Sequence, residues 1–256
     1  MPRKSPTLPY CWLAQNYDQL FSGFRIPLDL AREHILRRIL PNVETACDLA
    51  CGTGTTALAL ARKEIKVYAV DLSASMCALA RQKSERARLP VRVLRAAMRN
   101  FRLPVAVDLG TCEGDAINHL PNRGGLRAVA RSVARALRPG GYFYFDVNNS
   151  LGFRRYWSGI VWFEQPGFVV VMRNAHNTPA DHAWSDIEWF IRERACWRRY
   201  HERVEEVCWD AAEIRRVLEE AGFSHVRAWD AAPFFKGNPL IRRGCRTVYL
   251  ARKSGA

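Results

Sequence analysis

The sequence predicts an α/β protein with a doubly wound, mostly parallel sheet of seven strands. Two observations predict this class. From residue 43 to about residue 150, short apolar runs alternate with runs of helix-forming residues, and repeated strand–helix units imply a parallel sheet covered on both faces. The first apolar run carries an acid, Asp48, near its end. A turn with two glycines, Gly52 and Gly54, follows it, and then a helical run begins. This geometry lets a ligand bind the backbone N–H groups at a helix N-terminus.

The elements of this fold follow in order along the chain. Residues 1–42 hold a polar arm and two helical segments, the second starting at Pro27. We expect core strands at 43–49, 66–71, 91–95, 105–112 and 142–147, and core helices at 55–63, 74–88 and 123–138. A helix at 211–221, ended by Gly222, and strands at 226–230 and 247–251 complete the core.

Between the fifth strand and that last helix the pattern changes. Closely spaced antiparallel strands, with five of the eight tryptophans, fill residues 152–208. We therefore divide the chain into an N-terminal helical lid (1–42), a ligand-binding core (43–150), an antiparallel β insert over the substrate site (151–209) and the end of the core (210–256).

The amino-acid composition indicates a globular protein. A chain of 256 residues with 48% hydrophobic residues buries a sizeable core. Since it has no run of about 18 apolar residues and no secretory signal, we expect no membrane association and a cytoplasmic location. Its eight cysteines show neither C-x-x-C pairs nor zinc spacing, which predicts free thiols and no metal site.

The net charge of +14 suggests a polyanionic partner, but the basic residues are scattered along the chain. The chain also has neither a separate RNA-binding module nor an Asn/Asp-Pro-Pro-aromatic motif. A diffuse basic surface is the preferred interpretation, and a nucleic-acid partner is disfavoured.

The glycine turn alone is weak evidence of a binding site. It does not match the dinucleotide pattern G-x-G-x-x-G, because alanine stands at positions 50 and 57, and a purely structural turn explains it as well. The next strand strengthens the case, since it ends at Asp71, about 20 residues further on, where an acid can accept both hydroxyls of a ribose.

Several segments together resemble a class I S-adenosylmethionine (SAM)-dependent methyltransferase, which has a Rossmann-like fold. They are Asp48-Leu49-Ala50-Cys51-Gly52-Thr53-Gly54, Val70-Asp71-Leu72-Ser73-Ala74-Ser75-Met76, Asp108 to Asn118, Leu137-Arg138-Pro139-Gly140-Gly141 and Glu220-Ala221-Gly222-Phe223. The Tyr17-Asp18 pair and the strand-rich insert are similar to the small-molecule branch, which includes glycine N-methyltransferases and amino-sugar N-methyltransferases.

The resemblance implies SAM as cofactor and a role for each matching residue. Asp48 would hold its amino-acid end, Asp71 its ribose, and Tyr17 would close over the methionine portion. The remaining cofactor contacts implied are Ala50, Cys51, Gly52, Gly54, Leu72, Met76, Met98, Cys112 and Glu113. Ala97 departs from the family, which often has an acid there for the adenine amino group, and the loss of one hydrogen bond is worth ~1 kcal/mol.

Methyl transfer needs alignment, exclusion of water and removal of a proton, so no strong catalytic triad is expected. His119 is the best candidate for a general base, with Tyr17 and His201 as further catalytic candidates. Glu113 and Asp115 can attract a cationic amine. The candidate substrate contacts are Asn118, Trp157, Trp197 and Arg203. Structural roles stay open, such as a His119 packed under Pro121 or a cross-strand charge pair at His201 to Arg203.

The leading hypothesis is methyl transfer to a nitrogen or oxygen of a small molecule in secondary metabolism, by a monomer or homodimer. Three alternatives stay open. The same cofactor pocket can serve aminocarboxypropyl transfer or cyclisation. The charge permits a nucleic-acid methyltransferase or RNA-binding protein. The third alternative is a non-catalytic cofactor-binding module, which only Ala97 supports.

Overall fold

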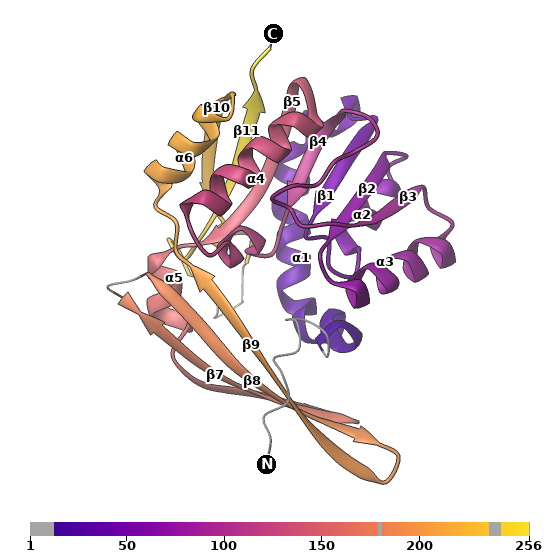
Figure 1. Ribbon diagram of the computed structural model, residues 1–256, viewed down its shortest axis with the longest axis vertical. Coiled ribbons are helices and arrows are strands. Elements are labelled where there is room, and N and C mark those ends of the chain that lie inside the picture. Colours follow the sequence, from indigo (N-terminus) through magenta and orange to yellow (C-terminus); the bar gives the residue numbers. More distant parts are fainter. Residues whose placement is uncertain (1–12, 179–180, 236–241, 256) are drawn as a thin grey trace.

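A seven-stranded sheet forms the core of the protein (Figure 1). The computed structural model describes residues 13–178, 181–235 and 242–255. The core strands are β1 (Thr45–Leu49), β2 (Lys66–Asp71), β3 (Val91–Arg95), β4 (Val107–Cys112), β5 (Leu137–Asn148), β10 (Phe223–Asp230) and β11 (Arg246–Lys253). Their order is β10-β11-β5-β4-β1-β2-β3. The pairs of β11 with β10 and β5 are antiparallel, and the other neighbouring pairs are parallel. The predicted fold class is confirmed.

Helices cover both faces of this sheet, because side chains alternate along each strand. Ala46 of β1 points into one core and Cys47 into the other. The helices are α1 (Tyr17–Leu36), α2 (Thr55–Ala61), α3 (Ala74–Ala87), α4 (Arg123–Ala136) and α6 (Ala211–Glu220). The first core includes residues of α4 and α6, and the second includes residues of α1, α2 and α3. Among the described residues, short 3-10 segments connect the elements: η1 (Leu13–Asn16), η2 (Leu40–Asn42), η3 (Ala116–His119) and η5 (Ala232–Phe234).

The insert is a second, antiparallel sheet that extends from the core beyond β5 (Figure 1). After α5 (Ser150–Tyr156) it comprises β6 (Gly159–Gln165), β7 (Phe168–Asn177), β8 (His182–Glu193) and β9 (Cys196–Val207), in that order. It has its own apolar cluster around the buried Trp189. Tyr17 and Phe21 of α1 and Trp157 after α5 pack against this cluster, so the start of α1 lies against the insert.

Three local expectations from the sequence are wrong. Pro27 does not start a helix but lies inside α1. The helix continues through it because Tyr17 and Phe21 before the proline pack against the insert, and Leu28 and Leu36 after it are buried. β5 begins at Leu137 and so includes the Pro-Gly-Gly segment that we expected to precede the strand. Residues 150–156 form a helix, capped by the side chain of Asn149, where strands and turns were expected.

No helix in the described part of the chain is long and apolar enough to cross a membrane. The cysteines of the described residues are free, as predicted. Five of them are buried, whereas Cys196 is exposed at the start of β9. Burial raises the pKa of the thiols of Cys47, Cys51 and Cys112.

We expect Gly152→Ala to destabilise the protein by at least about 2 kcal/mol, measured as the free energy of unfolding in denaturant. Gly152 is buried in α5, and an added Cβ would clash with the backbone carbonyl oxygen of Cys245. Gly23→Ala is the matched control, because Gly23 is an exposed helical glycine with open space around it. It should stabilise the protein by roughly 0.5–1 kcal/mol. Equal effects of both substitutions would contradict this packing.

Candidate active site

Two adjoining cavities lie at the carboxyl ends of the parallel strands. The first, of about 530 Å³, is bounded by the glycine turn after β1, the end of β2 and residues 96–99. The second, of about 870 Å³, runs from α1 and the glycine turn to the insert sheet. Both are lined by Tyr17, Gly52, Glu113 and Val204, so the two spaces meet there. One elongated ligand in each cavity could therefore present its reactive end to the other.

The glycine turn exposes bare backbone to the first cavity. Gly52 has φ +54° and open space where a Cβ would stand, so its peptide can approach a ligand closely. Gly54 has φ +84° at the start of α2, and a Cβ there would lie 3.0 Å from the Cβ of Ala80. Ala50 also has a positive φ of 49°, a strained conformation for a residue with a side chain.

Two carboxylates flank this turn with different surroundings. Asp71 accepts hydrogen bonds from the backbone N–H groups of Gly52 (2.9 Å) and Ser73 (2.8 Å), which fix its orientation in the first cavity. Asp48 lines the second cavity with 1% of its surface exposed. Its Oδ1 accepts from the hydroxyl of Thr111 at 2.8 Å, while Oδ2 has no partner among the described residues. Burial, with the nearby Glu113, raises the pKa of Asp48 to about 7.

Most of the residues predicted from the sequence line the cavities. Those in the first are Tyr17, Ala50, Gly52, Asp71, Leu72, Met76, Ala97, Met98, Glu113, His119 and Arg203. The second adds Asp48, Cys51 and Trp157. Gly54, Cys112, Asn118, Trp197 and His201 line neither of these cavities.

Neighbouring structure explains three of the residues that line neither cavity. Asn118 is fully buried, and its amide binds backbone atoms of Asn148 and Val207 at 2.9 Å, so it joins β5 to β9. Trp197 is 52% exposed, near the β8–β9 turn. His201 lies on the outward face of β9, 3.4 Å from Asp186. The inward face of β9 instead carries Glu202, Val204 and Glu206.

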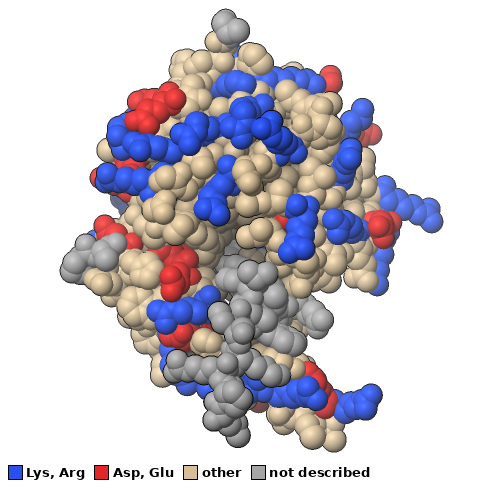
Figure 2. Space-filling model, in the orientation of Figure 1, with Lys and Arg blue, Asp and Glu red and all other residues tan. Residues whose placement is uncertain are grey.

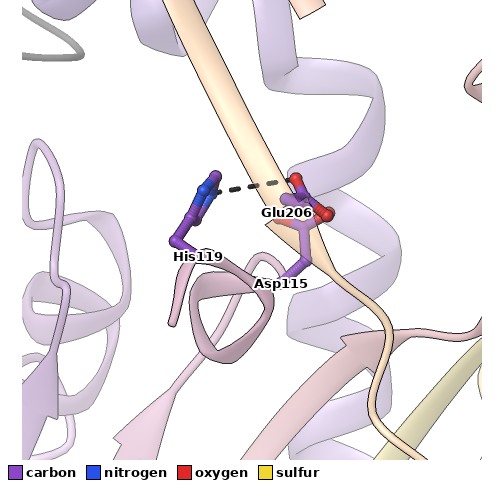
Figure 3. Close-up of side chains that lie close together, drawn as sticks. All are labelled: Asp115, His119 and Glu206. Carbon is purple, nitrogen blue, oxygen red and sulfur yellow. Dashed lines mark ion pairs between the residues drawn. The ribbon is translucent and has the colours of Figure 1, made fainter. Parts of the chain in front are cut away.

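His119 comes from η3 and faces the end of β9 (Figure 3). Its Nδ1 lies 3.1 Å from the backbone oxygen of Glu205, and its Nε2 lies 3.8 Å from Oε1 of Glu206. Burial lowers the pKa of His119 below 6.5, although Asp115 opposes this change. The ring is therefore neutral at pH 7 and can accept a proton.

Known proteins share both the sequence pattern and the fold. Residues 46–141 match the methyltransferase domain family. The putative methyltransferase YqeM of Bacillus subtilis is 26% identical over 247 residues, which are 96% of this chain and 97% of the relative. A dTDP-3-amino-3,6-dideoxy-alpha-D-glucopyranose N,N-dimethyltransferase of Streptomyces fradiae is 33% identical over 135 residues, 50% of each chain. The crystal structure of an S-adenosylmethionine-dependent methyltransferase from Clostridium acetobutylicum aligns with a TM-score of 0.80 at 23% identity, over 96% of this chain and 99% of that one.

Residues 46–141 form a methyltransferase domain, and the chain has the fold of class I S-adenosylmethionine-dependent methyltransferases. The methyltransferase domain, the fold and the enzyme class inferred from the sequence are confirmed. The methyltransferase has the mostly parallel seven-stranded sheet and the glycine turn after β1 that we expected from the sequence.

The sequence analysis missed the arginines that neutralise the acids of the methyltransferase site. Glu113 is buried and pairs with Arg25 at 3.1 Å and Arg32 at 2.8 Å, both from α1. Asp29 also pairs with both arginines. The spacing of Arg25, Asp29 and Arg32 puts them on one face of α1 beside the buried Leu28, a pattern of charges on an apolar face that could have revealed them.

A second buried arginine, Arg246, also lies beside the carboxyl ends of the parallel strands. Arg246 of β11 lies 2.5 Å from Asp115 and also pairs with Asp146 of β5. No local signal marks Arg246, since it follows its partners by about a hundred residues and stands in a stretch of other basic residues. Only the antiparallel pairing of β11 with β5 brings it to the site.

We expect Arg32→Met to lower the free energy of unfolding of the methyltransferase by about 3 kcal/mol, because it leaves Glu113 with one buried partner fewer. The control is Lys63→Met. It breaks the surface ion pair in which Nζ of Lys63 lies 2.9 Å from the carboxylate of Glu33 in α1. This pair is solvent-exposed, so its loss should change stability by less than about 1 kcal/mol. Denaturant unfolding of both variants measures the difference, and an Arg32→Met variant as stable as the control would refute the role of this ion pair.

Proposed function

We propose that the methyltransferase transfers the methyl group of SAM to an amine nitrogen of a small polar molecule in secondary metabolism. The observation that carries this proposal is the junction of the two cavities. Glu113 lines both of them, the neutral imidazole of His119 lines the first, and Asp115 lines the second. The similarity to a Streptomyces enzyme whose name describes dimethylation of an amino sugar supports a nitrogen acceptor.

The residues of the first cavity fit the nucleoside part of SAM. We assign the ribose hydroxyls to Asp71, whose carboxylate retains acceptor capacity beyond its two backbone bonds. The adenine would lie among Leu72, Met76, Ala97 and Met98, with Ala97 supplying no hydrogen bond. Since the Cβ position of Gly52 is open, the turn offers backbone N–H groups close to the ligand.

The amino-acid end of SAM fits the start of the second cavity. The unpaired Oδ2 of Asp48 can accept a hydrogen bond from its amino group. The buried Nε of Arg25 has no partner within the described ranges, and the side chain lines the same cavity, so we assign it the carboxylate. SAM then supplies a methyl group already activated by a positively charged sulfur.

The chain itself has to exclude water, orient the acceptor and take up a proton. Tyr17 lines both cavities at the start of α1. The segment 1–42, of which residues 1–12 lie outside the described residues, would act as the lid. Burial raises the pKa of the Tyr17 phenol, so it stays protonated and serves to position groups rather than as a base. His119 is the proposed base, and Trp157 forms part of the acceptor wall.

The other functions considered from the sequence lack support of this kind. Figure 2 shows Lys and Arg spread over the visible face, with Asp and Glu among them, rather than gathered into one basic groove. Aminocarboxypropyl transfer would use the same cofactor pocket, and mass spectrometry of products distinguishes it from methyl transfer. The cytoplasmic location and the choice between monomer and homodimer stay predictions.

We expect calorimetry to show SAM binding that Asp71→Ala weakens about a hundredfold, because two charge-assisted hydrogen bonds to the ribose are lost. Asp108→Ala is the matched control. Asp108 also accepts from two backbone N–H groups, those of Glu44 and Thr45, but it lies near the start of β4, at the opposite edge of the sheet. Absence of SAM binding in the wild type would refute the proposed function, and equal weakening by both variants would refute the role of Asp71.

We also expect His119 to titrate below 6.5 when its ring resonances are followed by NMR, because burial disfavours the charged ring. The proton-accepting form then persists as the pH falls through 6.5 and is lost only at lower pH. The activity of the enzyme should fall over the same acidic pH range in which His119 becomes protonated. A midpoint at or above 6.5 would contradict the environment that the structure gives this ring.

A further inference from the structure

The insert sheet turns one face toward the second cavity. Each of its strands lines the cavity with side chains spaced two residues apart, as the alternation of side chains along a strand requires. These side chains are Val161 and Phe163 of β6, Met172 and Asn174 of β7, Ser185 and Ile187 of β8, and Val204 and Glu206 of β9. The polar side chains among them call for an explanation in a wall that is otherwise apolar.

Ser185 brings to this wall a polar group that has no partner. Its side chain is 5% exposed, and its hydroxyl has no hydrogen-bond partner within the residues that the structure describes. Glu206 on the same face, by contrast, accepts a hydrogen bond from the side-chain amide of Asn148 at 3.3 Å. A buried hydroxyl without a partner costs stability, because it has given up its hydrogen bonds to water. A polar ligand in the cavity would remove that cost.

Strand pairing puts Ser185 between a second polar side chain and the junction of the two cavities. Asn174 of β7 lies directly opposite Ser185 on one side, and Val204 of β9 lies directly opposite it on the other. Side chains that face each other on neighbouring strands stand about 5 Å apart. Since Val204 lines both cavities, Ser185 and Asn174 form a polar row that begins one strand away from their junction.

The chemistry of this row suits an oxygen that carries no charge. A hydroxyl and an amide can each donate and accept hydrogen bonds, but neither supplies a charge to match an ion. Burying an unmatched ion costs far more than burying a hydroxyl. Arg246, a buried cation that lines the same cavity, is already paired with Asp115 and Asp146.

We propose that Ser185 determines acceptor specificity: its hydroxyl, with the amide of Asn174 beside it, binds an uncharged oxygen of the molecule that is methylated, such as a hydroxyl group. This inference rests on the proposed function and adds which second group of the acceptor the enzyme recognises. Because the polar row begins one strand from the junction, the bound oxygen lies near the nitrogen that receives the methyl group. The apolar side chains of the same face cover the carbon atoms of the acceptor.

An ordered water molecule is the competing occupant, because a water can also donate to and accept from a buried hydroxyl. A water that satisfies Ser185 would do so whichever acceptor is bound. The two occupants are therefore distinguished by two amines of the same size, of which only one carries an oxygen.

The test compares 2-aminoethanol with propylamine, which has a methyl group in place of the hydroxyl group. Ligand-observed NMR titrations of the full chain, without SAM so that no amine is consumed, give the ratio of the two dissociation constants. Ser185→Ala should lower the preference for 2-aminoethanol roughly fivefold, because one hydrogen bond to the ligand is lost. Ser132→Ala is the matched control and should leave the ratio unchanged. Ser132 is 1% exposed on α4 and lines neither cavity, and its hydroxyl donates to the backbone oxygen of Arg99 at 2.6 Å.

Denaturant unfolding of the same two variants gives a second readout that needs no ligand. Ser185→Ala removes a hydroxyl without a partner, so its unfolding midpoint should equal or exceed that of the wild type. Ser132→Ala removes a hydroxyl that is bonded, so its midpoint should fall below that of the wild type.

Each other outcome overturns the inference. These outcomes are no saturable binding of either amine to the wild type, an unchanged ratio in Ser185→Ala, an equal fall of the ratio in Ser132→Ala, or a midpoint of Ser185→Ala as low as that of Ser132→Ala. Calorimetry with SAM tests the proposed function separately. SAM binding with an unchanged ratio would leave methyl transfer standing and reject only this role of Ser185, whereas absence of SAM binding would reject methyl transfer whatever the ratio.

Discussion

The structure depends on the balance of charge along one edge of the parallel sheet. The carboxyl ends of β1 and β4 and the end of β5 bring Asp48, Glu113 and Asp146 into a buried space. Buried carboxylates are costly unless cations neutralise them. Arg25 and Arg32 of α1 and Arg246 of β11 supply those cations from distant parts of the chain.

This balance also arranges the site. The pairs of Arg25 and Arg32 with Glu113 hold α1 across the strand ends, and the start of α1 carries Tyr17 to the junction of the two cavities. The pairs of Arg246 hold the end of β11 against the loop that carries Asp115. The unpaired oxygen of Asp48 stays without a cation, and this is where we expect the amino group of the cofactor.

The insert lines the second cavity with residues of its sheet. The sequence analysis weighed the outward residues Trp197, His201 and Arg203 of β9, whereas the buried face carries Glu202, Val204 and Glu206. Alternation identifies the two faces of a strand but not which of them is turned inward, because polar residues lie on both. The packing of β9 against η3 made that choice.

The sequence by itself determined the fold, the glycine turn and the acid at Asp71, because a parallel strand, its turn and the following helix are specified by local periodicity and by glycine. It also singled out His119, a titratable group just beyond the fourth strand. Only the tertiary structure decided that Arg25 and Arg246 neutralise the strand edge, and that Asn118 joins two strands. Charge pairing over such separations follows from how the elements pack. The charges on the apolar face of α1 hint that Arg25 is partly buried but do not name its partner, and the sequence around Arg246 carries no such hint.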